Sequence, residues 1–326
     1  MRSEDTSQVS DQIFGTMPQE QCSGSTDHIF IVGLGRTGST LTRQILNSSA
    51  CVGIGGESHY LCDLPRLGFQ VRRSVRQRLA RVGDLTTEEG ARRVVDYLFT
   101  VQDRHLNFWK FSAKNVDREA FLRRLLAISP SERERGLFEL AMEVHADGRP
   151  MRGDKTPAHI FFIPRLLEWF PQAKIIHTFR DPRAIYASRK KKAEDKAGQS
   201  ARSGLRRLGV VFQLASSLHV IINWRRVERR HQQYQAQFPG RYALMKYEDL
   251  VQNPEVTLER LCSFLEIPLI QPMLLQKVVN SSFLPDGAAG FDVGSITRWR
   301  KHVDPLVQRW FLMWLGPQLS EYGYEA

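Results

Sequence analysis

Three stretches of the chain place cations, hydroxyls and glycines at spacings that suit the binding of phosphate-like groups. The first is Gly33–Thr40, with the sequence GLGRTGST. Glycines let the backbone take positive φ and let its N–H groups approach a ligand closely. Arg36 adds a cation inside the same loop. An anion, most often a phosphate, is expected here.

The residues around this loop predict a strand, a tight loop and a helix. The apolar run Ile29–Leu34 precedes the loop, and the amphipathic run Leu41–Leu46 follows it. The two glycines Gly33 and Gly38 match the frame of the ATP/GTP P-loop, but Ser39 stands where that motif requires Lys. We therefore expect a phosphate cradle that is not built for ATP hydrolysis. An ordinary strand–helix turn is the alternative.

The second stretch follows another expected strand, Lys174–Phe179. Arg180 comes directly after it, and Asp181 and Pro182 fit the N-cap and first position of a helix. Ser188 lies less than two turns into that helix, so one phosphate could contact both Arg180 and Ser188. Arginine forms bidentate, charge-assisted bonds to phosphate. A second anion site is predicted here.

The third stretch contains Lys155 at the start of an expected helix. Thr156 is predicted as its N-cap and Pro157 as its first residue, with the helix running to about residue 170. A cation beside the positive end of a helix is unfavourable unless an anion is shared between them. Lys155 is therefore a candidate ligand for the same anion, with a solvent-pointing lysine as the alternative.

One acidic residue is expected at the same edge of the sheet. Glu57 follows the short apolar run Cys51–Ile54, which predicts a second strand. In open parallel sheets ligands lie outside the carboxyl ends of the strands, so Glu57 is expected to face the crevice that the glycine loop borders. A solvated surface position is the alternative.

Composition limits the classes of protein that the chain can represent. It has 326 residues, 42% of them hydrophobic and 25% charged, which is typical of a globular protein. The net charge of +11 favours an anionic partner, although a generally basic surface would give the same value. No interleaved aromatic residues support nucleic-acid binding. No histidine, cysteine or carboxylate spacing suggests a metal.

The expected organisation is one α/β domain over residues 28–326, with a central parallel sheet flanked by helices. A helical insertion over residues 61–150 follows the second strand, because the apolar residues there repeat with helical period. Residues 190–207 are rich in Lys, Arg, Gly and Ser and are expected to form a mobile basic loop.

Cysteine usage and the first residues indicate a cytoplasmic protein. The four cysteines (Cys22, Cys51, Cys62 and Cys262) are scattered and are predicted to be reduced structural thiols. Residues 1–27 lack the order of a signal peptide and are expected to be a flexible tail. No apolar run reaches the length of a membrane span.

Two anion sites on one sheet suit a nucleotide that is phosphorylated at both the 5′ and the 3′ position. On these residues the chain resembles the sulfotransferases that use 3′-phosphoadenosine-5′-phosphosulfate (PAPS). Gly35–Thr40 is similar to their 5′-phosphosulfate loop, which often reads P-R-S-G-T-T, with Gly35 in place of the proline. Arg180–Ala184 with Ser188 is similar to their 3′-phosphate motif.

The resemblance extends toward the C-terminus. Lys246–Leu250 is similar to the family's Y-E-D-L segment, and residues 293–301 resemble the late loop that closes over PAPS. The residues that the resemblance assigns to PAPS are Gly35, Arg36, Thr37, Gly38, Ser39, Thr40, Arg180, Ser188, Tyr247, Ser295, Thr297, Arg300 and Lys301. It implies the product 3′-phosphoadenosine-5′-phosphate (PAP), no metal, and a small-molecule, glycan or peptide hydroxyl as acceptor.

The resemblance also suggests catalytic roles for Arg36, Lys155 and Glu57. Arg36 and Lys155 would hold the 5′-phosphosulfate. Cytosolic members take the acceptor proton with the histidine of a K-T-H segment, but Pro157 follows Thr156 here. Protein-tyrosine and several bacterial members instead carry a glutamate after the second strand, which Glu57 matches. Glu57 is thus preferred as the general base over His59 and His159, and a raised pKa would suit that role.

Two other classes of function stay open from the sequence. One is a P-loop kinase, which the Ser39 position and the lack of an acidic magnesium partner disfavour. The other is a non-catalytic module that binds a nucleotide or polyanion through its basic charge. The sequence does not set the oligomeric state or the acceptor.

Overall fold

Five parallel strands form the centre of this computed structural model. The structure describes residues 22, 27–62, 74–112, 114–207, 209–276, 283 and 290–325. The strands lie in the order β2-β3-β1-β4-β5. Their bounds are β1 (His28–Gly33), β2 (Val52–Ile54), β3 (Met151–Lys155), β4 (Lys174–Phe179) and β5 (Tyr242–Lys246). All the pairings are parallel, which confirms the expected class of fold.

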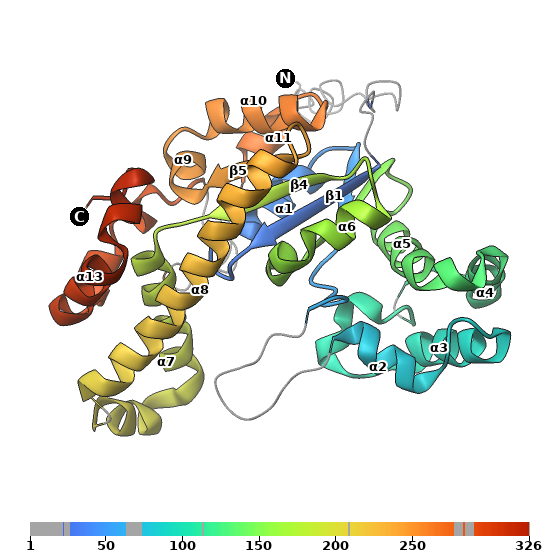
Figure 1. Ribbon diagram of the computed structural model, residues 1–326, viewed down its shortest axis with the longest axis horizontal. Coiled ribbons are helices and arrows are strands. Elements are labelled where there is room, and N and C mark those ends of the chain that lie inside the picture. The colour runs from blue at the N-terminus through green and yellow to red at the C-terminus, as the bar shows by residue number, and fades with distance from the viewer. Residues whose placement is uncertain are drawn as a thin grey trace, which may run out of the picture.

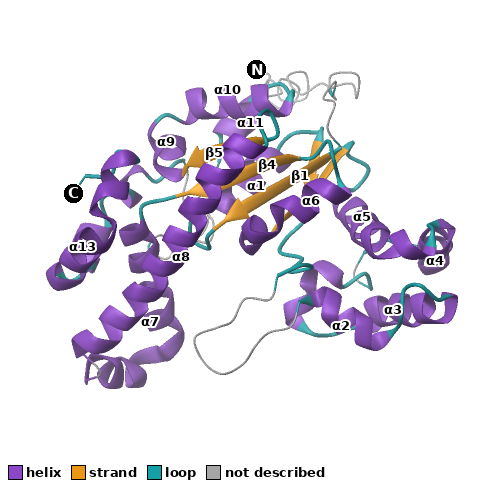
Figure 2. Cartoon of the chain, viewed as in Figure 1, coloured by secondary structure: helices purple, strands orange, loops and turns teal. Residues whose placement is uncertain are grey.

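Helices cover both faces of the sheet, as Figure 2 shows with the strands in orange. Successive side chains of β1 point to opposite faces, so Ile29 and Ile31 join one apolar core while Phe30 and Val32 join another. A parallel sheet needs such cover because both its faces are apolar.

One core lies between the sheet and four helices that pack on the same face. It contains residues of α1 (Ser39–Asn47), α9 (Tyr247–Gln252), α10 (Pro254–Leu265) and α11 (Gln271–Leu274). The other core contains residues of α5 (Arg133–Ala146), η4 (Pro157–Phe162), α6 (Ile163–Trp169), α8 (Gly209–Gln237) and α13 (Pro305–Glu321).

Between β2 and β3 the described chain is helical. The elements are α2 (Val75–Val82), α3 (Glu88–Thr100), η2 (Arg104–Trp109), α4 (Arg118–Ala127), η3 (Pro130–Glu132) and α5. Side-chain caps begin several of them: the Thr87 hydroxyl accepts from the N–H of Gly90, and the Asp117 carboxylate accepts from that of Ala120. In Figure 1 helices α2, α3 and α4 gather beside the sheet rather than over it.

The prediction of a loop over residues 190–207 is wrong, because that segment lies in α7 (Pro182–Arg207). Helix α7 contacts α8, and the two extend away from the sheet in Figure 1. Gly198 and Gly204 each cost about 1 kcal/mol in a helix, which is why they favoured a loop. Contact with a neighbouring helix offsets such costs.

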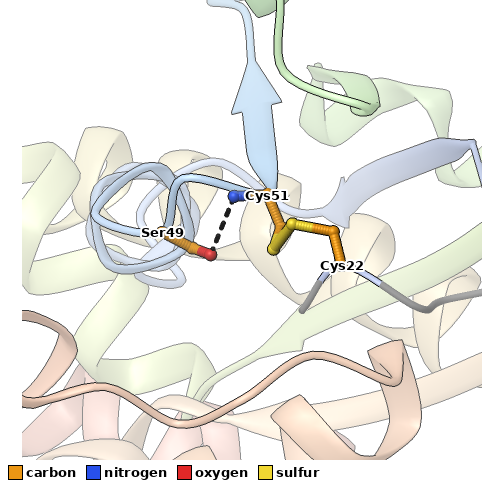
Figure 3. Close-up of a disulfide and its surroundings, with 3 residues drawn as sticks. All are labelled: Cys22, Ser49 and Cys51. Atoms are coloured by element: carbon orange, nitrogen blue, oxygen red, sulfur yellow. Dashed lines mark hydrogen bonds between the residues drawn. A yellow bond between two sulfur atoms is a disulfide. The ribbon is translucent and has the colours of Figure 1, made fainter. Parts of the chain in front are cut away.

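The prediction that all four cysteines are reduced is also wrong. Cys22 forms a disulfide with Cys51, which directly precedes β2 (Figure 3). The thiols of Cys62 and Cys262 are buried. The two partners are 29 residues apart, a spacing that carries no local signal. Disulfides persist in oxidising compartments, so this bond removes the cysteine argument for a cytoplasmic protein.

The expected tail over residues 1–27 lies mostly outside the described residues. Two of its residues are held by the fold: Cys22 through the disulfide, and Asp27, whose carbonyl accepts from the Arg152 N–H at 2.8 Å. In the part of the chain that the structure describes, no helix combines the length and apolar character that crossing a bilayer requires.

The late part of the chain returns to the sheet through short elements. These are η5 (Val293–Ser295), α12 (Trp299–His302) and α13. The Tyr324 hydroxyl donates to Glu248 at 3.2 Å, and Glu248 also accepts from the N–H of Asp181 at 3.1 Å. The chain end is thereby linked to the carboxyl ends of β4 and β5.

Candidate active site

The carboxyl ends of the five strands bring most of the predicted site residues to one edge of the sheet. Glu57 follows β2, Lys155 ends β3, the glycine loop follows β1, Arg180 follows β4 and Tyr247 follows β5. The order of the strands places the loop between Lys155 on one side and Arg180 on the other. The two predicted anion sites therefore belong to one edge.

The glycine loop is held in a shape that other residues would not adopt easily. Gly38 has φ 87°, and a β-carbon on it would lie 2.5 Å from the ring of Tyr247. Gly33 has φ 139°, and a β-carbon there would lie 2.3 Å from the carbonyl oxygen of Thr178. Arg36 takes φ 79° without being a glycine, a conformation that costs on the order of 1–3 kcal/mol and is frequent at functional sites.

Hydroxyl groups fix the base of the loop. The Thr37 hydroxyl donates to the carbonyl of Leu34 at 2.7 Å and lies 2.7 Å from the hydroxyl of Thr178 on β4. Thr37 is thus a buried support whose side chain points into the protein. Gly38 is the N-cap of α1, so the first N–H groups of that helix, at Ser39 and Thr40, face outward from the loop.

A cavity opens beside the loop, between α1, α7 and the late segment. Its lining residues include these predicted ones: Arg36, Gly38, Ser39, Thr40, Arg180, Ser188, Tyr247 and Ser295. The lining also includes Leu41, Ala184, Ala187, Phe283, Gly290, Phe291, Asp292, Arg298 and Trp299. Gly35 and Thr37 lie in the loop itself.

The two predicted anion sites adjoin one another within this cavity. The Arg36 guanidinium donates through Nε to the hydroxyl of Ser188 at 2.8 Å, which joins the loop to α7. Arg180 donates to the carbonyl oxygens of Arg36 at 3.2 Å and Ser295 at 3.1 Å, and its guanidinium stacks 4.0 Å from the ring centre of Tyr247. Tyr247 and Ser295 share a hydrogen bond of 2.9 Å.

The cavity is strongly electropositive. Burial lowers the pKa of Arg36, and the neighbouring charge of Arg180 lowers it further. Asp292, the one carboxylate among the described lining residues, forms two hydrogen bonds of 2.7 Å with Arg298 and is thereby neutralised. Arg180 also keeps a buried Nε without a hydrogen-bond partner among the described residues. Such a site is suited to anionic ligands.

Glu57 lies at the other side of the loop and is paired with Lys155 and His59. The buried Lys155 ammonium donates to its Oε1 at 2.7 Å, and His59 Nε2 lies 3.2 Å from its Oε2. Burial raises the pKa of Glu57, but the hydrogen bond to His59 and the charge of Lys155 outweigh this and lower it to about 2. The raised pKa that would suit a general base is therefore not found for Glu57 in this arrangement.

The backbone that carries Glu57 is fixed by buried side chains of β3 and the following turn. The Ser58 N–H donates to Asp154 at 3.1 Å and to the Thr156 hydroxyl at 3.0 Å. The Leu61 N–H donates to Nε2 of His159 at 3.3 Å, and Nδ1 of His159 lies 2.8 Å from Asp154. His159 is fully buried, with Nε2 accepting a hydrogen bond and Nδ1 beside Asp154, and this burial disfavours it as a base.

Thr156 does not cap the helix that follows it. Its hydroxyl donates to Asp154 at 2.9 Å, and no side-chain cap bond is formed to η4. The prediction of Pro157 as the first helical residue is confirmed, although the first turns are 3₁₀. The predicted cap at Asp181 is confirmed, because its carboxylate accepts from the Arg183 N–H at 2.8 Å.

The late segment contributes different residues from those expected. Ser295 lines the cavity, but Thr297, Arg300 and Lys301 are not among its described lining residues. Arg300 instead forms an ion pair with Glu325. The adjacent positions Arg298 and Trp299 line the cavity, an offset that sequence reasoning could not detect in a short helix.

Two further arginines near the site have no counterpart in the sequence analysis. Arg43 lies on α1 near Glu57. Burial lowers the pKa of Arg43, and the negative charge of Glu57 raises it by a smaller amount. Arg189 lies on α7 directly after Ser188, and its pKa is lowered by burial and then by the charge of Arg36. Helical spacing alone offered no signal that these side chains would lie at the loop.

A model of the sulfotransferase family matches residues 28–271 of the chain. This range covers the five strands, the glycine loop, Glu57, Lys155 and Arg180. The late segment that contributes Ser295, Arg298 and Trp299 lies beyond it.

Two solved structures share the fold at low sequence identity. The sulfotransferase domain from the Synechococcus PCC 7002 olefin synthase is 18% identical, with a TM-score of 0.55 over 92% of this chain and 96% of that one. The sulfotransferase domain from the curacin biosynthetic pathway is 20% identical, with a TM-score of 0.50 over 93% of this chain and 99% of that one.

Each curated relative matches this chain over only part of the relative's own length. A protein of Aquifex aeolicus named only as uncharacterised is 23% identical over 304 residues, which is 90% of this chain and 34% of the relative. A putative protein-tyrosine sulfotransferase of Caenorhabditis elegans is 26% identical over 131 residues, which is 40% of this chain and 45% of the relative. The chain thus spans less than half the length of either.

Proposed function

The chain belongs to the sulfotransferase family, and we propose that it transfers the sulfuryl group of PAPS to a hydroxyl group of an acceptor. One observation supports this most directly. The carboxylate of Glu57 and the ammonium of Lys155, 2.7 Å apart, lie at the same sheet edge as the loop and cavity of Arg36, Arg180 and Ser188. An anion cradle beside a paired acid and base suits group transfer from an anionic donor.

The residues of the cavity suit the two charged ends of PAPS. The N–H groups at the start of α1, with Arg36, fit the 5′-phosphosulfate. Arg180 and Ser188 fit the 3′-phosphate, and the buried Nε of Arg180 without a protein partner is a donor that a ligand oxygen would satisfy. Trp299 and Phe291 give the same cavity apolar surface for the adenine.

Bound PAPS supplies a sulfuryl group on a phosphate leaving group. In the proposed reaction a bond forms between the acceptor oxygen and sulfur, and the bond between sulfur and the bridging oxygen of the 5′-phosphate breaks. The acceptor proton passes to the carboxylate of Glu57. Arg36, Lys155 and the N–H groups of the loop stabilise the charge that grows on the bridging oxygen.

The pairing of Glu57 suggests how its basicity is controlled. With Lys155 bound to it, the carboxylate has a pKa of about 2 and is a weak base. Lys155 is also a cation that the resemblance assigns to the 5′-phosphosulfate. When Lys155 turns to the donor, Glu57 loses a positive partner, and its pKa rises toward the usual value of a glutamate.

The choice of Glu57 as the base is the arrangement that the resemblance attributes to protein-tyrosine and bacterial members. A relative with the former name is among those described above. His59 is the competing candidate, because it lies 3.2 Å from Glu57 and is partly exposed. The acceptor is proposed to be a small-molecule, glycan or peptide hydroxyl.

The test combines a binding and a transfer measurement on the full chain. Calorimetric titration with PAP should show one site, and PAPS labelled in sulfur should transfer label to at least one member of a panel of phenols, sugars and tyrosine peptides. Absence of PAP binding would overturn the proposal. PAP binding without transfer to any acceptor would favour a binding protein, and magnesium-dependent ATP turnover would favour a kinase.

A further inference from the structure

The peptide group that joins Arg180 to Asp181 is held at both of its polar atoms by buried side chains. Its carbonyl oxygen, on Arg180, accepts from the indole Nε1 of Trp224 on α8 at 3.0 Å. Its N–H, on Asp181, donates to Oε1 of Glu248 on α9 at 3.1 Å. Trp224 and Glu248 are both buried. The point at which the Arg180 side chain leaves the backbone is therefore fixed by two other elements.

The residue before Glu248 contacts the other end of Arg180. The ring centre of Tyr247 lies 4.0 Å from the guanidinium carbon, a stacked arrangement that orients the plane of the charged group. Two consecutive residues at the start of α9 thus contact both the backbone and the charged end of Arg180. A shift of this short segment would move both ends of the arginine together.

Tyr324 holds the second oxygen of Glu248. Its hydroxyl donates to Oε2 at 3.2 Å, and both residues are only 7% exposed. The carbonyl oxygen of the next residue, Glu325, accepts from the Arg183 guanidinium at 2.7 Å. Residues 324–325 therefore connect α9 to α7, which begins two residues after Arg180.

Glu248 is a costly residue to bury for stability alone. Burial raises the pKa of its carboxyl group, and the charge of Arg180 lowers it by a smaller amount. A buried acid is tolerated when its hydrogen bonds are made, and here they are made to the peptide of Arg180 and to a tyrosine hydroxyl. Glu248 is not among the described residues that line the cavity, so any effect on a ligand there passes through Arg180.

We propose that Glu248 is a positioning residue of the donor site, and that its carboxylate, held by Tyr324, sets how strongly Arg180 binds the 3′-phosphate of PAPS. The inference rests on the proposed function, because it takes Arg180 to bind that phosphate. Charge-assisted hydrogen bonds between a guanidinium and an oxyanion keep to a narrow range of length, about 2.7–2.9 Å, so a small displacement of Arg180 weakens them.

The experiment isolates the 3′-phosphate by comparing two ligands in calorimetric titrations. PAP carries this phosphate and adenosine 5′-phosphate does not, so the ratio of their affinities measures what the 3′-phosphate contributes. The variants are Glu248→Ala, Glu248→Gln and Tyr324→Phe, and Arg180→Gln is the reference for loss of the cation. The matched control is Tyr242→Phe, which removes a buried hydroxyl hydrogen-bonded to two histidines at the opposite end of β5 from the site. Urea unfolding establishes that each variant is folded.

The expected result is a selective loss of PAP affinity. Glu248→Ala should lower the affinity for PAP by about 10-fold and leave that for adenosine 5′-phosphate within about twofold. Glu248→Gln keeps an oxygen for the Asp181 N–H and should recover most of the ratio, whereas Tyr324→Phe should lower it by about threefold. Tyr242→Phe should keep the wild-type ratio.

A double variant tests whether Glu248 acts through Arg180. Arg180→Gln should itself remove most of the preference for PAP over adenosine 5′-phosphate. In that background Glu248→Ala should have no further effect on PAP affinity, because residues that act as one unit are not additive.

Three results would overturn the inference. One is a wild-type ratio in folded Glu248→Ala or, should that variant not fold, in Tyr324→Phe. Another is an equal loss of affinity for both ligands, and the third is a further fall in PAP affinity when Glu248→Ala is added to Arg180→Gln. A wild type that does not prefer PAP, or an unchanged ratio in Arg180→Gln, would instead overturn the role of Arg180 in the proposed function, so the two failures are distinguishable.

Discussion

At the scale of single residues, the site depends on how Glu57 is charged. Its side chain is 41% exposed, yet its two oxygens are occupied by Lys155 and His59. Opposite charges at this distance favour the ionised carboxylate more strongly than partial burial disfavours it. The residue is therefore always deprotonated near neutral pH, and what can vary is its basicity.

Replacing this carboxylate tests its role as the base. Glu57→Gln keeps the size of the side chain but cannot take a proton, so turnover should fall by about 10²- to 10⁴-fold while the affinity for PAP changes little. Turnover is measured with labelled PAPS and affinity by calorimetry. Glu168→Gln, in an exposed ion pair with Arg165, is the control. Turnover within a factor of two of the wild type would transfer the role to His59.

The same pairing predicts how stability depends on pH. Its ion pairs lower the pKa of Glu57 to about 2 in the folded chain, from an ordinary value of 4.5. A lowered folded pKa stabilises the fold above the unfolded pKa, and that contribution is lost as pH falls from about 4.5 toward 2. Because other carboxylates titrate in this range, the measured quantity is the difference between wild type and Glu57→Gln.

Denaturant unfolding of both proteins at pH 6 and at pH 3 provides that difference. The wild type should exceed Glu57→Gln in free energy of unfolding at pH 6, and the gap should narrow at pH 3. A gap that stays constant or widens on acidification would contradict the assigned ion pair.

At the scale of elements, β3 and η4 hold the segment that carries Glu57. Thr156 is fully buried. Its hydroxyl accepts a hydrogen bond from the N–H of Ser58 and donates one to Asp154. Asp154 in turn faces His159, which accepts from Leu61. The carboxylate of Glu57, the proposed base, is exposed, but its backbone is hydrogen-bonded to a buried polar network.

Substitutions at Thr156 test this support. Thr156→Val keeps the shape and removes the hydroxyl, so the fold should lose about 1–3 kcal/mol and kcat should fall with little change in PAP affinity. Thr156→Ser restores the hydroxyl and should recover most of kcat. Equal kcat in the valine and serine variants would show that the hydroxyl only stabilises the fold.

The elements also show what sequence patterns could and could not predict. The strand, loop and helix around Gly33–Thr40 could be predicted from local apolar periodicity and glycine spacing. The Asp181 cap could be predicted because the residues that form it are neighbours in the sequence. Thr156 has equally good capping chemistry, but a buried carboxylate two residues earlier takes its hydroxyl. The sequence predicted the start of α7 at Pro182 but not its second half, because the glycines and charges there favour a loop and the support comes from contact with α8.

At the scale of the whole molecule, the sheet edge gathers residues that lie as far apart in sequence as Arg36 and Tyr247. Because the strands were predicted to be parallel, the sequence indicated that these residues lie at one edge of the sheet. It did not indicate the distances between them. Sequence alone suggested two separated anion sites, whereas Arg36 and Ser188 are in direct contact at 2.8 Å. Pairings that arise from tertiary contact, such as Cys22 with Cys51, leave no local pattern.

The disulfide should contribute to global stability. It joins Cys22 to Cys51 just before β2, with a sequence separation of 29. Its removal should lower the free energy of unfolding by about 2–4 kcal/mol, because the unfolded chain gains conformational entropy. Cys22→Ser, Cys51→Ser and the double variant should unfold at similar, lower denaturant concentrations. Wild type in reducing agent should match them. A wild type unaffected by reduction would contradict the bond.

The contact between Glu57 and Lys155 also implies a sequence of events. A carboxylate that stays weakly basic until its lysine partner is drawn away cannot activate the acceptor in advance. Donor entry would thus come before productive acceptor encounter, and initial-rate kinetics should follow a compulsory-order pattern in which PAP competes with PAPS alone.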